Sequence, residues 1–336
     1  MCADSAPQAY LSMEETTARF AWSFGGGSQE TSDTCSGDAA GVWELQSPAM
    51  PMDLNDHAAV IDLLEEAAVL LRSHPNRRGC CVNLPARGRL VLTGDLHDNV
   101  IHLKKVLSLA KLDQDPEHHV ILHELIHGER LINGLDFSHR MICRVAELVR
   151  EAPLQVHPLL ANHEMAQLTG KGVSKGAGNA TELFLEAIDY VYGDDGPDVA
   201  EAVNTFFKAM PLALRSEHGV FCAHSLPNNR LMGSFDRDVL ERELVDEDYL
   251  GPTGAAYSMC WGRVHTDEQL AELAESWGVR MFCLGHQKVE TGIEQRHPNA
   301  ITLNSDHDRG VALPVRLDAL PSPEEALINA IPLNAI

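Results

Sequence analysis

The sequence of 336 residues lacks long apolar runs and has few basic side chains. No stretch approaches the roughly 18 to 20 apolar residues of a membrane span, and residues 1–10 lack the basic start and apolar core of a signal peptide. The 26 Lys and Arg are outnumbered by 49 Asp and Glu, which gives a net charge of −23 at pH 7. Such a charge repels nucleic-acid backbones and anionic membranes. We therefore expect a cytoplasmic protein with no nucleic-acid or membrane partner.

Paired cysteine motifs and aromatic residues are also scarce. None of the eight cysteines forms a CxxC pair, and several lie in apolar runs, as Cys222 and Cys283 do. We expect reduced thiols in the core, because scattered cysteines in a long chain do not form a disulfide framework. Aromatic residues make up only 5% of the chain, whereas histidine occurs 17 times. This excess of histidine favours metal chemistry.

The chain divides by composition into four segments. Residues 1–50 are rich in Ser, Gly, Thr and acidic residues, and we expect a disordered tail there. Residues 51–85 contain an amphipathic pattern over 56–72, which predicts a helix and a lead-in to the main domain. We expect the main domain over 86–320 and a C-terminal tail over 321–336.

The main domain alternates between short apolar runs and helical patterns, which predicts an α/β protein. In such proteins ligands bind beyond the carboxyl ends of the strands. After residue 285, strands follow without helices, which predicts an antiparallel finish to a second sheet. The expected strands are 90–92, 120–122, 155–160, 219–223, 280–284, 289–295, 300–304 and 310–317, and the expected helices are 99–111, 138–150, 181–192, 197–209, 236–245 and 267–277.

A cluster of side chains able to bind metal follows each of the first five apolar runs. These clusters are Gly-Asp-Leu-His-Asp-Asn at 94–99, His-Glu-Leu-Ile-His at 123–127, Ala-Asn-His-Glu at 161–164, Ala-His at 223–224 and Gly-His at 285–286. Carboxylate, imidazole and amide oxygen together form a donor set that suits Mn, Fe or Zn, and a carboxylate can bridge two ions. Two ions can clamp a phosphoryl group and activate water near neutral pH.

The order of these clusters resembles the calcineurin-like metallophosphoesterases, most closely their serine/threonine-phosphatase-like branch, over roughly 88–318. The resemblance implies a four-layer αββα fold, in which a two-sheet sandwich is flanked by helices. It also implies a hydrolase that cleaves a phosphate ester with hydroxide held by two divalent ions. The substrate it implies is a phosphoprotein, a nucleotide or a small phosphate ester.

The site residues implied by this resemblance come from the clusters at the strand ends. Residues 94–97 match the family's GDxH, although Asp98 replaces the glycine that follows, and residues 161–164 resemble GNHE with Ala161 for glycine. His163 is then the acid that protonates the leaving group. The implied ligands are Asp95, His97 and Glu124 for one ion, and Glu124, Asn162, His224 and His286 for the other.

The second motif departs from the family. Its GDxxDRG aligns with residues 123–129, which places Glu124 where an Asp usually bridges the metals and His127 where an Asp usually orients the catalytic histidine. Gly128 replaces the arginine that usually holds the phosphate. Another cation must then bind the substrate, and the candidates are Arg130, Arg140 and Arg263. We select Arg263, because the segment 261–263 loosely resembles an active-site segment of the branch.

Two other interpretations remain open at this stage. His123–His127 is also an HExxH, the zincin signature, in which His123 and His127 bind zinc from one helix face and Glu124 is the base. The zincin interpretation requires a helix at a position where an apolar strand pattern ends. It also leaves the other four strand-end clusters unexplained. The altered second motif also allows a binding or interaction module without catalysis.

Overall fold

The computed structural model describes residues 52–172 and 178–336, so the tail expected over 1–50 lies outside the described residues. The helices are α1 (His57–Arg72), α2 (Val100–Ala110), α3 (His139–Glu151), α4 (Asn162–Thr169), α5 (Ala180–Tyr192), α6 (Gly196–Ala209), α7 (Ala255–Trp261), α8 (Asp267–Trp277) and α9 (Pro323–Asn329). In this part of the chain, no helix is both long and apolar enough to cross a bilayer.

The strands form two sheets. They are β1 (Arg77–Arg78), β2 (Cys81–Leu84), β3 (Arg89–Thr93), β4 (His118–His123), β5 (Val156–Leu159), β6 (Ala213–Ser216), β7 (Val220–Ala223), β8 (Met281–Leu284), β9 (Ile293–His297), β10 (Ala300–Leu303), β11 (Val311–Arg316) and β12 (Ile331–Pro332). One sheet has seven strands in the order β1-β2-β6-β7-β8-β10-β9, and the other has five in the order β12-β11-β3-β4-β5.

The two sheets pack face to face. Because neighbouring side chains on a strand face opposite sides, each strand contributes to two layers of the core. Leu90 and Leu92 of β3 pack in one cluster with Val220 and Cys222 of β7, whereas Val91 faces the helices. The expected sandwich of two sheets flanked by helices is therefore confirmed.

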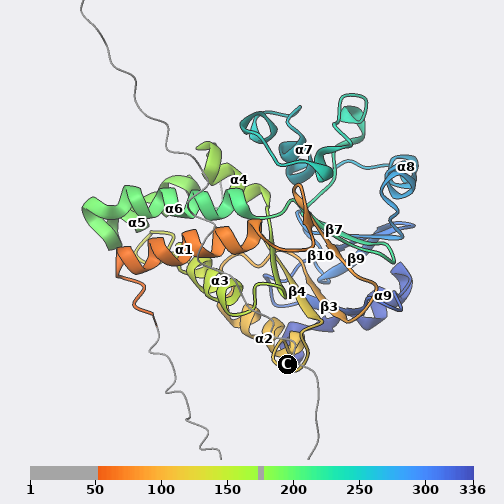
Figure 1. Cartoon of the computed structure of the whole chain (residues 1–336), viewed down its shortest axis with the longest axis horizontal. Helices are drawn as coiled ribbons and strands as arrows, with labels where there is room; N and C mark the ends of the chain where they lie inside the picture. The colour runs from red at the N-terminus through yellow and green to blue at the C-terminus, as the bar shows by residue number, and fades with distance from the viewer. Residues whose placement is uncertain (1–51, 173–177) are drawn as a thin grey trace, which may run out of the picture. The chain divides into compact units, whose positions relative to one another are not determined.

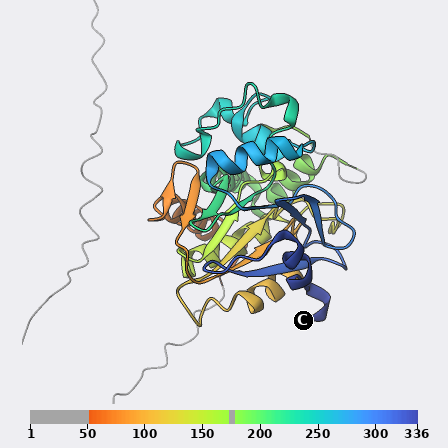
Figure 2. The same ribbon diagram turned by 90° about the vertical axis from the view of Figure 1, so that its right-hand side faces the viewer.

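Helices cover the outer faces of both sheets. The buried stripe of α1 begins after Asp56, whose carboxylate accepts the amide hydrogens of Ala58 and Ala59 and so caps the helix. Figure 1 shows α1, α3, α5 and α6 grouped on one side of the molecule, and α1 contacts both α3 and α6. In Figure 2 the strands lie below α8, which is drawn in light blue.

The antiparallel finish is divided between the sheets. β9 and β10 pair antiparallel and extend the seven-stranded sheet, since β10 is parallel to β8. The last long strand, β11, instead returns to the other sheet and pairs antiparallel with β3. The prediction of one antiparallel finish to a second sheet was therefore only partly right, because apolar runs do not indicate which sheet they join.

Two further expectations differ from the structure. The segment 236–245, predicted as a helix, holds only a short 3-10 turn at Val239–Glu241. Arg242 explains the difference, because its guanidinium binds the carboxylates of both Asp236 and Asp248 and folds the segment back on itself. The strands β2 and β6, which pair in parallel, were not predicted, because a polar residue interrupts the short apolar run of each, Asn83 in β2 and Arg215 in β6.

The segment 321–336, expected to be a tail, is instead folded onto the domain. α9 begins with a capping box formed by Ser322 and Glu325. β12 pairs antiparallel with β11, and the side chains of Ala326 and Leu333 are fully buried. This segment therefore completes the edge of the five-stranded sheet.

A group of buried histidines lies near the amino ends of β4 and β5. Nδ1 of His119 lies 3.2 Å from Nε2 of His157, and the ring of His74 contacts the ring of His157 at a centroid distance of 5.4 Å. Burial lowers the pKa of His119 to about 4 and the pKa of His157 well below its ordinary value. Both imidazoles are therefore neutral in the folded protein at pH 7.

These histidines predict that the fold loses stability in mild acid. Below the ordinary histidine pKa of about 6.5, the unfolded chain binds protons that the folded chain binds only near pH 4, so stability present above pH 6.5 is lost as the pH falls. For His119 alone the loss by pH 5 is about 2 kcal/mol. Urea denaturation of chelator-treated protein at pH 7.5 and pH 5 measures it.

Between pH 7.5 and pH 5, the free energy of unfolding of His119→Gln should fall by about 2 kcal/mol less than that of the wild type. The matched control is His118→Gln at the neighbouring, less buried position, which should lose as much as the wild type. Equal losses in His119→Gln and in the control would contradict the assignment.

Candidate metal centre

Polar side chains from both sheets meet at the carboxyl ends of the central strands. Asp95 follows β3, Glu124 follows β4 and Asn162 begins α4 after β5, all from the five-stranded sheet. His224 follows β7 and His286 follows β8, both from the seven-stranded sheet. All five side chains are buried. The site therefore draws its ligand atoms from both halves of the sandwich.

One group of ligand atoms surrounds Asn162. Its Oδ1 lies 2.6 Å from Nε2 of His224 and 2.9 Å from Nδ1 of His286, and these two nitrogens are 3.2 Å apart. Burial lowers the pKa of His224 well below its ordinary value and that of His286 to about 3. Both imidazoles are therefore neutral, as metal ligands must be.

Glu124 lies between this group and a second one. Its Oε2 is 3.8 Å from Nε2 of His224 and 3.4 Å from Nε2 of His97. Its Oε1 is 3.5 Å from Nε2 of His163. Glu124 thus belongs to two sets of possible ligands, one with His97 and His163 and the other with Asp95 and His224. A carboxylate in this position can bridge two cations.

Asp95 lies beside the two histidines of the seven-stranded sheet. Its carboxylate accepts the amide hydrogen of His286 at 3.0 and 3.1 Å, and its Oδ1 lies 3.6 Å from Nδ1 of His224. It is grouped with His224 and Glu124, whereas His97 is grouped with His163. The structure therefore brings Asp95 and His97 to the same site, each in a group that also contains Glu124.

The backbone at the site adopts unusual conformations. Positive φ angles occur at His97 (42°), Asp98 (56°), Glu124 (41°), His127 (59°) and His286 (66°), none of which is glycine. Each such residue costs about 1 kcal/mol or more, and such strain concentrates at functional sites. The clustering of these residues at the strand ends points to function rather than to folding.

Hydrogen bonds fix the orientation of these side chains. The fully buried Glu164 accepts the amide hydrogens of Leu125 at 2.7 Å and Ile126 at 3.3 Å, which holds the turn after Glu124. Nδ1 of His97 donates to the carbonyl of Ile126 at 3.1 Å, so its Nε2 faces Glu124. Such outer hydrogen bonds set the tautomer and direction of a ligand.

His127 contacts a residue that the sequence reading missed. Its Nδ1 lies 2.7 Å from Oδ2 of Asp136, and its ring lies 5.4 Å from the ring of His163 between centroids. Asp136 is buried, and its Oδ1 accepts the amide hydrogen of Ser138. The only sequence signal for Asp136 is its place in Asp-Phe-Ser, directly before α3. This pattern is equally typical of the start of a helix.

The HExxH segment is not helical. His118–His123 is a strand, and Glu124 and His127 have positive φ. Nδ1 of His123 donates to the carbonyl of Thr93 at 3.1 Å, and burial lowers the pKa of His123 to about 4. His127 is directed to Asp136 instead of sharing a face with His123. The arrangement of a zincin is therefore absent from this segment.

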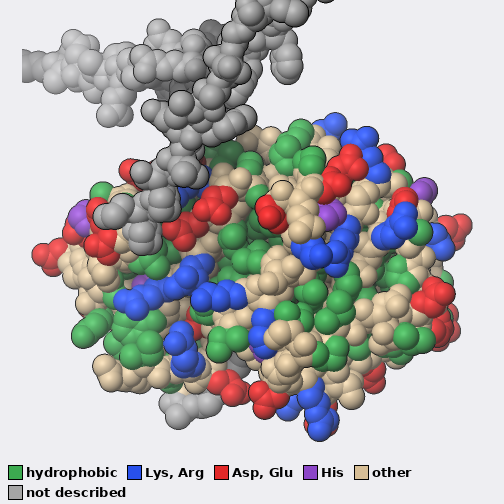
Figure 3. Space-filling view, turned by 90° about the horizontal axis from the view of Figure 1, so that it is seen from below, with side chains coloured by type: hydrophobic (Ala, Val, Ile, Leu, Met, Phe, Trp, Pro, Cys, Tyr) green, Lys and Arg blue, Asp and Glu red, His purple; other side chains and the backbone are tan. Residues whose placement is uncertain are grey.

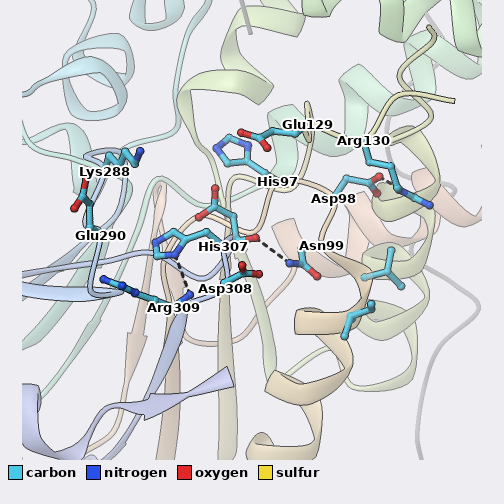
Figure 4. A pocket seen from close by; sticks show the side chains of 13 residues that line it. His97, Asp98, Asn99, Glu129, Arg130, Lys288, Glu290, His307, Asp308 and Arg309 are labelled. Atoms are coloured by element: carbon cyan, nitrogen blue, oxygen red, sulfur yellow. Dashed lines mark hydrogen bonds and ion pairs between the residues drawn. The ribbon is translucent and has the colours of Figure 1, made fainter. Parts of the chain in front are cut away.

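Two adjoining cavities open at the site. The metal-centre cavity, of about 340 Å³, is lined by ligands such as Asp95 and Glu124 and by the basic residues Arg263 and Lys288. The outer cavity, of about 790 Å³, carries Arg130 and Arg309. The cavities share five lining residues, which are His97, Glu129, Lys288, Asp306 and His307. Figure 4 shows the outer cavity with side chains of both signs around it.

The candidate phosphate-binding arginines have different surroundings. Arg263 lines the metal-centre cavity, and its Nη1 donates to the carbonyl of His286 at 3.1 Å. Arg130 instead binds Asp98 at 3.1 Å, and Arg140 lies over the ring of Phe137 at 5.1 Å and lines neither of these two cavities. Of the three candidates, only Arg263 lines the metal-centre cavity.

Residues 88–290, more than half of the chain, match the sequence model of the calcineurin-like phosphoesterases. The chain therefore belongs to this family and is a phosphate-ester hydrolase. No curated protein sequence gives a significant match.

Solved structures of phosphatases share the fold. A protein serine/threonine phosphatase from Saccharomyces cerevisiae has a TM-score of 0.56 at 15% identity, covering 77% of this chain and 82% of its own. A cold-active protein-tyrosine phosphatase of a psychrophilic Shewanella species has a TM-score of 0.51 at 15% identity, covering 75% and 80%. At these identities the similarity concerns the fold.

Proposed function

We propose that this chain hydrolyses a phosphate ester at a centre of two divalent metal ions, of Mn, Fe or Zn. The observation that carries the proposal is the position of Glu124, whose carboxylate reaches two separate sets of ligands. Neutral imidazoles, carboxylates and the amide oxygen of Asn162 form a donor set that fits such ions. The ligands would be Asp95, His97 and Glu124 for one ion, and Glu124, Asn162, His224 and His286 for the other.

The protein side chains have distinct tasks in this proposal. His163 donates a proton to the leaving oxygen as the ester bond breaks. His127, held by Asp136, packs against His163 and keeps its ring in position. Arg263 binds oxygens of the phosphoryl group, because its guanidinium is held at the rim of the metal-centre cavity. Two bound ions would supply positive charge to the phosphoryl oxygens and lower the pKa of water.

Hydrolysis of an aryl phosphate with added Mn²⁺, together with elemental analysis, tests this function. We expect turnover and about two metal ions per chain in the wild type, and loss of both in the Asp95→Asn, His224→Ala double variant. The matched control is Asp113→Asn with His218→Ala, where both side chains are exposed and both measurements should be unchanged.

Equal metal content in the wild type and the site variant would overturn the metal centre. Metal without turnover on an aryl phosphate, a phosphopeptide or a nucleotide would overturn the catalytic proposal and leave a binding module. The same panel identifies the substrate class.

A further inference from the structure

Lys288 lies on the loop after His286 and lines both cavities of the site. Its side chain is exposed, and it forms no ion pair with a carboxylate of residues 52–172 or 178–336. In Figure 4 its ammonium end points across the cavity toward His97 and Glu129. Lys288 and Arg263 are the Lys and Arg residues that line the metal-centre cavity.

The loop that carries Lys288 is held from outside the cavity. Nη2 of Arg296 donates to the carbonyl of Lys288 at 3.0 Å, and its Nη1 donates to Oε1 of Gln287 at 2.9 Å. The guanidinium of Arg296 also binds Glu294 at 2.9 Å. The backbone of Lys288 is therefore fixed relative to His286, so its ammonium has only the rotamers of its own side chain to lose on binding.

The position that usually carries a phosphate-binding arginine cannot carry one here. A Cβ added to Gly128 would lie 2.5 Å from the carbonyl oxygen of His97, closer than such atoms approach. The next residue but one, Arg130, is bound to Asp98. The segment after Glu124 therefore supplies no cation to the metal-centre cavity, and positive charge there must come from the opposite wall.

We infer that Lys288 binds the scissile phosphate group together with Arg263, as the replacement for the arginine that Gly128 excludes. The inference rests on the proposed phosphoesterase function. An ammonium offers three donors on a flexible stem, so it can follow a phosphate oxygen through the reaction without the fixed geometry of a guanidinium. With the phosphate held by Lys288 and Arg263 in the metal-centre cavity, the leaving group would extend into the outer cavity, which Lys288 also lines.

The test is the affinity of the manganese-loaded protein for inorganic phosphate, measured by isothermal titration calorimetry, which requires no turnover. Lys288→Gln should weaken phosphate binding about tenfold or more, because a charge-assisted hydrogen bond is lost. Lys288→Arg should stay within about threefold of the wild type. Metal content should be unchanged in both.

Arg309→Gln is the matched control, because Arg309 lines the outer cavity but not the metal-centre cavity. It should leave phosphate affinity unchanged. Unchanged affinity in Lys288→Gln, or an equal loss in Arg309→Gln, would overturn the inference. A raised KM for esters with normal phosphate affinity would also overturn it, since Lys288 would then contact the leaving group. Failure of the proposed function would appear separately, as a wild type that binds phosphate but does not turn over.

Discussion

Glu124→Gln is expected to lower both metal content and turnover, the latter by about a thousandfold. The carboxylate lies 3.4 Å from His97 and 3.8 Å from His224, between the two groups of ligand atoms. A neutral amide has no charge to share between two cations, so one ion should be lost first. Elemental analysis and turnover of an aryl phosphate, measured on the same preparation, check both effects.

The matched comparison is His123→Ala, one residue earlier on the same strand end. His123 is buried and donates to the carbonyl of Thr93, so its loss should cost about 2 kcal/mol of stability and leave the metal content intact. The opposite pattern, with metal kept in Glu124→Gln and lost in His123→Ala, would show that the HExxH segment binds metal as in a zincin. That result would contradict the phosphoesterase site.

His163→Asn is expected to slow hydrolysis by about 100-fold to 10,000-fold when the leaving group is a poor one. An alkyl oxygen needs a proton as the ester bond breaks, whereas a nitrophenolate leaves without one, so the two substrates should respond differently. Rates for an alkyl phosphate and for p-nitrophenyl phosphate, each compared with the wild type, measure the difference.

Metal content distinguishes the role of His163 as proton donor from a role as metal ligand, which the geometry also allows. Its Nε2 lies 3.5 Å from Glu124, within the group that also contains His97. We expect His163→Asn to keep its metal, while His97→Asn, the matched variant in the same group, loses one ion. Loss of metal in His163→Asn, with equal slowing for both leaving groups, would show that His163 is a ligand and not the acid.

The strand ends that carry the site could be predicted from the sequence because two local signals coincide there. The short length of the apolar runs of β3 and β8 favours buried strands, and polar residues directly after parallel strands are expected to meet at one edge of the sheet. Asp95 and His286 were found in this way although they are far apart in the chain. Periodicity also gave α1 and α8 nearly to the residue.

The remaining features depend on contacts between distant segments, which no local pattern encodes. Asp136 could not be assigned, because its importance comes from the ring of His127 and not from its neighbours in sequence. Lys288 resembles any exposed lysine until the fold places it beside the metal-centre cavity. The false helix over 236–245 has adequate helix propensity, but the ion pairs of Arg242 outweigh it.

The division of the ligands between the two sheets also bears on how the protein folds. Asp95, Glu124 and Asn162 belong to one sheet, and His224 and His286 belong to the other. Ions held by both sets would crosslink the halves of the sandwich, so part of their binding free energy becomes resistance to unfolding. By the same linkage, packing between the sheets sets the spacing of the ligands. Substitutions in that apolar layer would then alter metal affinity.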